Sequence, residues 1–264
     1  EVMNELKVFV KSAQIRDCSI GHLLFSGGAG LGKTTVAQVV ANEVGSRFHF
    51  ITAPNMTGEV LKETLVKLEE GDVLFIDEIH RLNIRVEEVL YSAIEDFVME
   101  MSIKTSRGNE IVDAPLPKFT LIGATTRLDL VSRPLRTRFQ RVFKMRNYDL
   151  DSLSKIVENS ASKLEVNITN PAAREIAKRS RGVPRIANQL LTNIRDHFVA
   201  KGLDEMCLEQ VCEAFDSMGV DSAGLNYDDR LYLEALSRND RPVGLNSLAT
   251  YVDEAESTVE DWRC

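Results

Sequence analysis

The sequence predicts an α/β fold in which a parallel, phosphate-binding sheet is followed by an all-helical region. Up to about residue 144, short strands that are apolar on both faces alternate with helical periodicity, which is typical of a parallel sheet covered on both sides. A glycine-rich loop follows the first strand and precedes a helix. After Tyr148 the strand pattern disappears.

Each element of the sheet region follows from its own pattern. The apolar run at 22–25 ends in Ser26-Gly27-Gly28, which indicates a buried strand that meets a tight loop. Strands are expected at residues 22–25, 48–51, 72–76, 119–124 and 142–143, with helices at 34–44, 58–70 and 83–97.

The segment 97–118 interrupts this alternation. Its two extended arms, 98–104 and 110–113, are joined by the turn residues 105–109, which predicts an inserted β-hairpin.

The remainder of the chain has helical periodicity only. The expected helices cover 149–164, 170–180, 184–200 and 204–218, followed by short helices at 228–238, 244–252 and 257–264. These elements predict a division into 1–147, 148–222 and 223–264.

Composition narrows the class of protein. The 264 residues are 44% hydrophobic and 27% charged, as in a globular protein with ample apolar surface to bury. The lack of an 18-residue apolar run and of a signal-peptide pattern argues against a membrane or secreted protein. Four cysteines without CxxC spacing are expected to be reduced thiols, which fits the cytoplasm.

Charge is unevenly distributed. The formal net charge is −8, so a whole-molecule basic footprint for nucleic acid is absent. Segments 127–146 and 171–201 each carry seven basic residues, whereas 203–264 carries four basic and fifteen acidic ones. A solvated face is one interpretation of the basic runs, and contact with anions is the other.

The glycine-rich loop 27–34 reads Gly-Gly-Ala-Gly-Leu-Gly-Lys-Thr and matches G-x-x-x-x-G-K-[ST]. Such a loop turns its N–H groups toward a phosphate, and the following helix points its positive end at it. Lys33 is expected to reach the β- and γ-phosphates and Thr34 to offer a hydroxyl to Mg²⁺. The alternative is a structural glycine-rich turn.

Acidic and hydroxyl side chains follow two later strands. The strand at 72–76 leads into Asp77-Glu78, and the strand at 119–124 leads into Thr125-Thr126. We expect Asp77 to orient Mg²⁺, Glu78 to act on the attacking water, and Thr126 to sense the γ-phosphate. An acidic helix start and a threonine-containing turn are the structural alternatives, and His80 is assigned no role.

Three arginines are candidates for contact with an anion, two of them for stabilising charge in the transition state. Arg136 and Arg138 follow Pro134, and Arg185 lies in the first turn of a helix, where the dipole disfavours a cation without a nearby anion. A structural ion pair is the other interpretation for each.

In this order, the motifs resemble those of AAA+ ATPases and, more narrowly, of the RuvB family of Holliday-junction branch-migration motors. The resemblance covers nearly the whole chain. It is carried by these segments: 73–82, 86–91, 119–127, 134–139, 182–191, 220–225 and 242–245.

The resemblance implies roles residue by residue. In the core, the Walker A pair is Lys33 and Thr34, the Walker B pair Asp77 and Glu78, and sensor 1 Thr126. Outside these motifs, Arg138 is the finger that reaches the next subunit's ATP, Arg185 is sensor 2 and Tyr148 lies by the adenine. ATP would be held by Gly30, Leu31, Gly32, Lys33, Thr34, Thr35, Tyr148 and Arg185, and Mg²⁺ by Thr34 and Asp77.

The resemblance also implies partners and architecture. An AAA+ core at 1–147, a helical lid at 148–222 and a partial winged-helix domain at 223–264 would form a homo-oligomeric ring, a hexamer. The hairpin at 97–118 would dock on RuvA, duplex DNA at four-way junctions would be the substrate, and RuvC is a further candidate partner.

The chain departs from the family pattern in three ways. Gly28 and Ala29 replace the usual two prolines, which predicts a more flexible loop. The chain starts after the family's upstream stretch and ends before its winged helix is complete, which reduces the expected DNA binding. The alternatives are therefore a clamp-loader-like switch and a truncated homologue that binds nucleotide without translocating.

Overall fold

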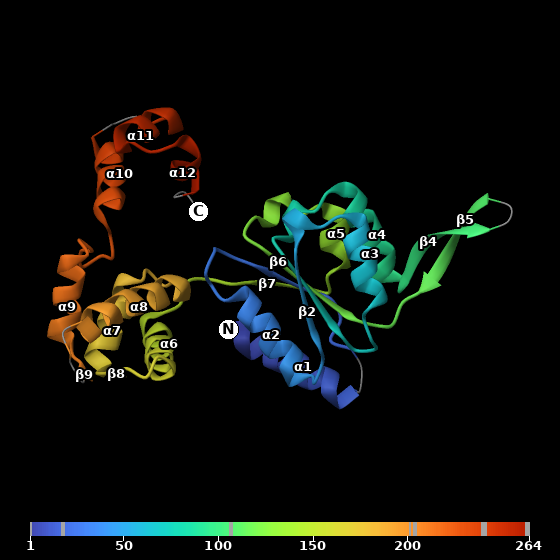
Figure 1. The fold of residues 1–264 in the computed structure, drawn as a ribbon, viewed down its shortest axis with the longest axis horizontal. Coiled ribbons are helices and arrows are strands. Elements are labelled where there is room, and N and C mark those ends of the chain that lie inside the picture. Colours follow the sequence, from blue (N-terminus) through green and yellow to red (C-terminus); the bar gives the residue numbers. More distant parts are fainter. Residues whose placement is uncertain are drawn as a thin grey trace. The chain divides into compact units, whose positions relative to one another are not determined.

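The computed structural model describes residues 2–16, 19–105, 108–200, 202, 205–238 and 242–261. It divides into two compact units (Figure 1). The first contains Glu1–Gly27 and Gly32–Arg146, and the second contains Gly28–Leu31 and Asn147–Cys264.

The first unit is built on a five-stranded parallel sheet, as the sequence predicts. Its strands lie in the order β2-β3-β6-β1-β7. Their bounds are β1 (Leu23–Ser26), β2 (Phe48–Thr52), β3 (Val73–Asp77), β6 (Thr120–Thr125) and β7 (Arg141–Lys144). β6 therefore lies between β1 and β3, although it follows both in the chain.

Helices cover both faces of the sheet because successive strand residues point to opposite sides. Leu74 and Ile76 pack toward α3 (Gly58–Val66), α4 (Ile84–Glu95) and α5 (Arg133–Arg138). On the other face, Val73 and Phe75 belong to the core formed with α1 (Val2–Arg16) and α2 (Lys33–Glu43). The predicted α/β class is thus confirmed.

The helices of this unit depart from the predicted ones at several points, and α5 was not predicted at all. α1 was not predicted, because its apolar residues are spread around the helix and only Leu6, Val10 and Ala13 are buried. α3 ends at Val66 rather than at 70, where the Asp72 carboxylate accepts the N–H of Glu69 in a turn. α4 ends at Glu95 rather than at 97, because Phe97 has a left-handed backbone.

The predicted hairpin is present as the antiparallel pair β4 (Val98–Thr105) and β5 (Gly108–Pro115). It extends away from the sheet beside α4 (Figure 1). The arms are longer than expected, and the turn residues 106–107 lie outside the described part of the chain.

The second unit contains two apolar cores. One is formed by α6 (Leu150–Lys163), α7 (Asn170–Arg179), α8 (Pro184–Ala200) and α9 (Leu208–Ser217). The other is formed by α10 (Tyr227–Ser237), α11 (Leu245–Val252) and α12 (Glu256–Asp261). None of the described helices combines the length and apolarity that a membrane span requires.

The expectation that strands end at Tyr148 is wrong. β8 (Asn167–Ile168) and β9 (Glu205–Met206) form a small parallel pair. The helix predicted at 204–218 begins only at Leu208, because the two residues of β9 pair with β8.

A buried histidine just before β1 connects the end of α4 to β6. His22 lies between the carbonyl oxygen of Ile94, 2.8 Å from Nε2, and the backbone N–H of Leu121, which donates to Nδ1 at 2.9 Å. This geometry requires the neutral ring with its proton on Nε2. Burial lowers the pKa of His22 below its usual value.

We predict that His22 makes the fold sensitive to acid. Its pKa is lower in the folded than in the unfolded protein, so the unfolded state binds more protons below about pH 6.5 and stability falls there by up to about 1.4 kcal/mol per pH unit. Urea unfolding between pH 5 and 7.5 measures this slope. His22→Gln should flatten it, whereas the exposed His197→Gln should not; equal slopes in all three proteins would contradict the assignment.

Candidate nucleotide-binding and hydrolysis site

The sheet of the first unit brings together three groups of predicted site residues. β1, β6 and β3 are consecutive and parallel, so their carboxyl ends meet at one edge. The phosphate loop follows β1, Asp77 and Glu78 lie at the end of β3, and Thr126 follows β6. Ligands of open α/β sheets bind at this kind of edge.

Lys33 and the two threonines after it form the first turn of α2. Lys33 is buried, with 7% exposed, and its Nζ donates to the carbonyl of Gly27 at 2.8 Å. Thr34 is half-buried and Thr35 is exposed. Since the first turn contains no acidic residue, the positive end of α2 is not neutralised by its own helix, as an anion site requires.

The two carboxylates expected to form the Walker B pair are fixed by local hydrogen bonds. Asp77 Oδ1 accepts the backbone N–H of Glu78 at 3.0 Å. Glu78 has φ of 51°, a left-handed conformation that is uncommon for a residue with a side chain and recurs at functional sites. Its Oε2 accepts the hydroxyl of Thr126 at 3.2 Å, so these two predicted residues are in direct contact.

A glycine in β6 sets how closely the segment after Glu78 approaches the sheet. The short 3₁₀ helix η2 (Ile79–Arg81) places Ile79, fully buried, over Gly123. A Cβ at position 123 would lie 2.9 Å from Cδ1 of Ile79, which is closer than packing allows. A side chain at position 123 would therefore require the ends of the Ile79, Leu24 and Phe139 side chains to move.

Arg138 is held by its own chain. Its guanidinium forms an ion pair of 2.6 Å with Glu95 and lies 4.4 Å from the centre of the Tyr91 ring. A quarter of the Arg138 side chain is exposed, so the guanidinium is paired within its own chain but still reaches the surface. Tyr91 in turn donates to Glu87 at 2.6 Å.

The second unit groups the other predicted ATP ligands. The N–H of Arg185 donates to the carbonyl of Gly30 at 3.2 Å, and the hydroxyl of Tyr148 donates to the carbonyl of Leu31 at 3.4 Å. Gly30 has φ of 77°, and a Cβ there would lie 2.7 Å from Cβ of Arg185. Burial raises the pKa of Tyr148, so its hydroxyl stays protonated, while Arg185 is exposed.

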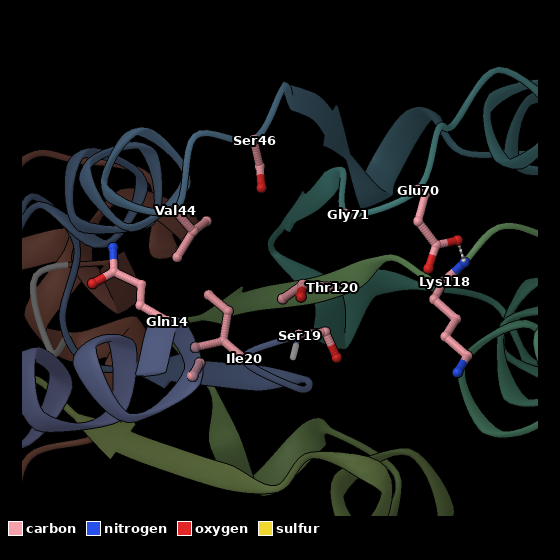
Figure 2. A pocket seen from close by; sticks show the side chains of 10 residues that line it. Gln14, Ser19, Ile20, Val44, Ser46, Glu70, Gly71, Lys118 and Thr120 are labelled. Atoms are coloured by element: carbon pink, nitrogen blue, oxygen red, sulfur yellow. Dashed lines mark hydrogen bonds between the residues drawn. The ribbon is translucent and has the colours of Figure 1, made fainter. Parts of the chain in front are cut away.

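A cavity lies at the opposite edge of the sheet. It has a volume of about 620 Å³ and is lined by residues at or just before the starts of strands, among them Ile20, Ser46 and Thr120 (Figure 2). Gln14 and Lys118 also line it. None of the predicted nucleotide ligands lines it, so it is not the nucleotide site.

The donor set fits a magnesium ion bound mainly through substrate. In the described part of the chain, no three His, Cys, Asp or Glu side chains gather into a ready-made metal site. Mg²⁺ bound to a nucleotide needs only one or two protein oxygens beside phosphate and water. The hydroxyl of Thr34 and the free carboxylate oxygen of Asp77 provide donors of that type.

Three positioning side chains were missed by sequence reasoning. His80 contacts Glu78, Glu95 pairs with Arg138, and Glu87 accepts hydrogen bonds from Tyr91 and Ser132. Residues 87, 91 and 95 are four apart and therefore lie on one face of α4. This spacing could have revealed the roles of Glu87 and Glu95.

Comparisons with known proteins agree with this geometry. Residues 1–145 match the family described as Holliday junction DNA helicase RuvB P-loop domain, and residues 148–221 match the RuvB AAA lid domain. The chain belongs to the RuvB family.

Individual relatives of this RuvB-family chain match over nearly its whole length. The Holliday junction branch migration complex subunit RuvB of Campylobacter fetus is 45% identical over 99% of the chain and 76% of the relative. The subunit of that name from Streptococcus uberis is 44% identical over 99% of the chain and 79% of the relative.

A solved structure extends the similarity to the fold. The RuvB Holliday junction branch migration motor of Thermotoga maritima matches with a TM-score of 0.84 and 38% identity, over 98% of this chain and 83% of that one. Membership of this P-loop family implies nucleotide binding and an ATP-hydrolysing motor.

We predict that Gly123→Ala lowers ATP turnover. The added methyl group displaces Ile79 and with it Glu78, and overpacking of this kind costs about 1–3 kcal/mol of unfolding free energy. Steady-state turnover and urea unfolding measure the two effects. Gly58→Ala is the matched control, because a Cβ there meets nothing within 4 Å; equal turnover in both variants would contradict the role of Gly123.

Proposed function

We propose that this chain is the ATP-driven motor subunit that moves Holliday junctions by branch migration in recombination and DNA repair. The observation that carries the proposal is one edge of the parallel sheet. The helix beginning at Lys33 follows β1 there, and the pair Asp77-Glu78 lies at the end of β3, with β6 between the two strands. This arrangement provides phosphate binding and water activation in a chain of the RuvB family.

Lys33 and the start of α2 bind the triphosphate. The Nζ of Lys33 donates to the carbonyl of Gly27, and in this proposal the ammonium group turns to the phosphate oxygens when ATP binds. The free N–H groups of the first turn, including those of Thr34 and Thr35, add partial positive charge.

Glu78 orients and deprotonates the attacking water. One of its oxygens, Oε2, accepts the hydroxyl of Thr126, and this contact fixes the direction of the carboxylate. Thr126 is thereby placed to report the state of the γ-phosphate to Glu78. When bound by Thr34 and Asp77, Mg²⁺ would neutralise charge on the β- and γ-phosphates.

The chain acts as a homo-oligomeric ring, a hexamer, in which Arg138 reaches the ATP of the neighbouring subunit. Its guanidinium must then leave Glu95 for the phosphates. Glu95 is the accessible partner in this exchange, because 55% of its side chain is exposed, whereas Arg138 also gives up a hydrogen bond to the carbonyl of Pro134 and its contact with the Tyr91 ring.

In the second unit, α6 to α9 form the proposed lid, which carries Arg185 and Tyr148 as the proposed ATP ligands. Arg185, sensor 2, is exposed and lies at the start of α8, where an anion satisfies both the guanidinium and the helix dipole. Tyr148 presents its aromatic ring for the adenine while its hydroxyl holds the loop at Leu31. In this proposal the domains are the AAA+ core at 1–147, the lid at 148–222 and a partial winged helix at 223–264.

The partners follow from the family. RuvA and duplex DNA at four-way junctions are the proposed partners, the hairpin at 97–118 being the contact to RuvA, and RuvC is a further candidate. Exposed apolar side chains on the hairpin, including Met101 and Ile111, fit such a docking role.

Branch migration on a synthetic four-way junction tests the function. With RuvA, ATP and Mg²⁺, the chain should convert the junction into two duplexes, and Lys33→Ala should abolish both conversion and ATP turnover. Gel electrophoresis and phosphate release measure the two activities.

The other outcomes identify the alternatives. Turnover without junction conversion would indicate a clamp-loader-like switch, and nucleotide binding without turnover would indicate a truncated homologue. Either result would contradict the proposed motor.

We predict that Arg138→Ala lowers turnover about 10³-fold or more, and only in the assembled ring, because an arginine finger acts on the next subunit's ATP. Turnover is measured across a dilution series, with analytical ultracentrifugation to follow assembly. Arg133→Ala, an exposed arginine at the start of the same helix, should retain turnover. An equal loss from Arg138→Ala in dilute monomer would show that the residue does not act on a neighbour.

A further inference from the structure

His80 lies between the carboxylate of Glu78 and the end of β6, the strand that precedes Thr126. It belongs to η2, three residues beyond Asp77, and only 8% of its side chain is exposed. Its Nδ1 is 2.9 Å from Oγ1 of Thr125 and 3.2 Å from Oε2 of Glu78. One ring nitrogen therefore contacts the last residue of β6 and the residue after β3.

The partners of Thr125 and Glu78 determine which way these hydrogen bonds run. The hydroxyl of Thr125 already accepts the backbone N–H of Arg127 at 3.0 Å and keeps one proton and one acceptor site. An unprotonated Nδ1 could accept that proton, but its lone pair would then face the Glu78 carboxylate. A protonated Nδ1 attracts both oxygens, so ionised Glu78 favours the Nδ1–H form.

We propose that His80 is a positioning residue for Glu78. The hydroxyl of Thr126 donates to Oε2, and the protonated Nδ1, 3.2 Å from the same oxygen, attracts it as well, so that Oε1 is left to accept the proton of the attacking water. Because the same nitrogen contacts Thr125, a movement at the end of β6 reaches the carboxylate through His80. The proposal rests on the proposed hydrolytic function of Glu78.

Three substitutions separate positioning from packing. Asparagine can place an amide N–H near the position of Nδ1, whereas glutamine reaches toward the position of Nε2, and alanine removes both. His80→Ala and His80→Gln should lower kcat by about 10- to 100-fold, typical of losing a residue that orients a catalytic group, and leave KM for ATP within about twofold. His80→Asn should recover most of kcat, and His197→Ala, exposed in the second unit, should not change it.

A second measurement tests the contact without turnover. In ¹⁵N-histidine-labelled protein, Glu78→Gln should shift the Nδ1 resonance of His80 while that of His49, which pairs with Asp72 instead, stays unchanged. A wild-type chain without turnover would refute the hydrolytic function, and the resonance would still test the pairing. The proposal is overturned if the resonance does not move, or if the alanine, glutamine and asparagine variants of an active enzyme are equally active.

Discussion

The strand order is the constraint on which the site depends. Residues 27, 77 and 126 are far apart in the chain, and they reach one edge because β6 inserts between β1 and β3 in a wholly parallel sheet. Parallel pairing aligns the carboxyl ends, so each strand delivers its following residues to the same side. The chemistry is then decided by the few residues beyond each strand.

A buried carboxylate organises the neighbouring helices. Glu87 is only 5% exposed, and its carboxylate accepts hydrogen bonds of 2.6 Å each from the hydroxyl groups of Tyr91 and Ser132. Ser132 also caps α5 through the N–H of Leu135, so the start of α5 is tied to α4. Arg138 at the end of α5 is thus positioned by a buried network, yet its own ion pair is exposed enough to exchange partners.

Sequence reasoning succeeded where a local pattern determines the outcome. Apolar strands such as 73–76 and the loop ending in Gly32-Lys33 carry their own signals, because burial on both faces and phosphate binding restrict residue type. It failed at β8 and β9, whose two-residue pairing depends on tertiary contact. His80 was also missed, because its contact is with Thr125, 45 residues further along the chain, and no local pattern predicts that contact.

The phosphate loop shows how tertiary contacts offset a sequence feature. Gly28 and Ala29 are exposed and give the loop conformational freedom that costs entropy on ordering. Two hydrogen bonds from the helical unit, from Arg185 to Gly30 and from Tyr148 to Leu31, hold the following residues. Gly30 is packed so closely on Arg185 that no side chain fits. Order in residues 28–31 therefore comes from the helical unit, which couples the shape of the loop to the residues proposed to bind ATP.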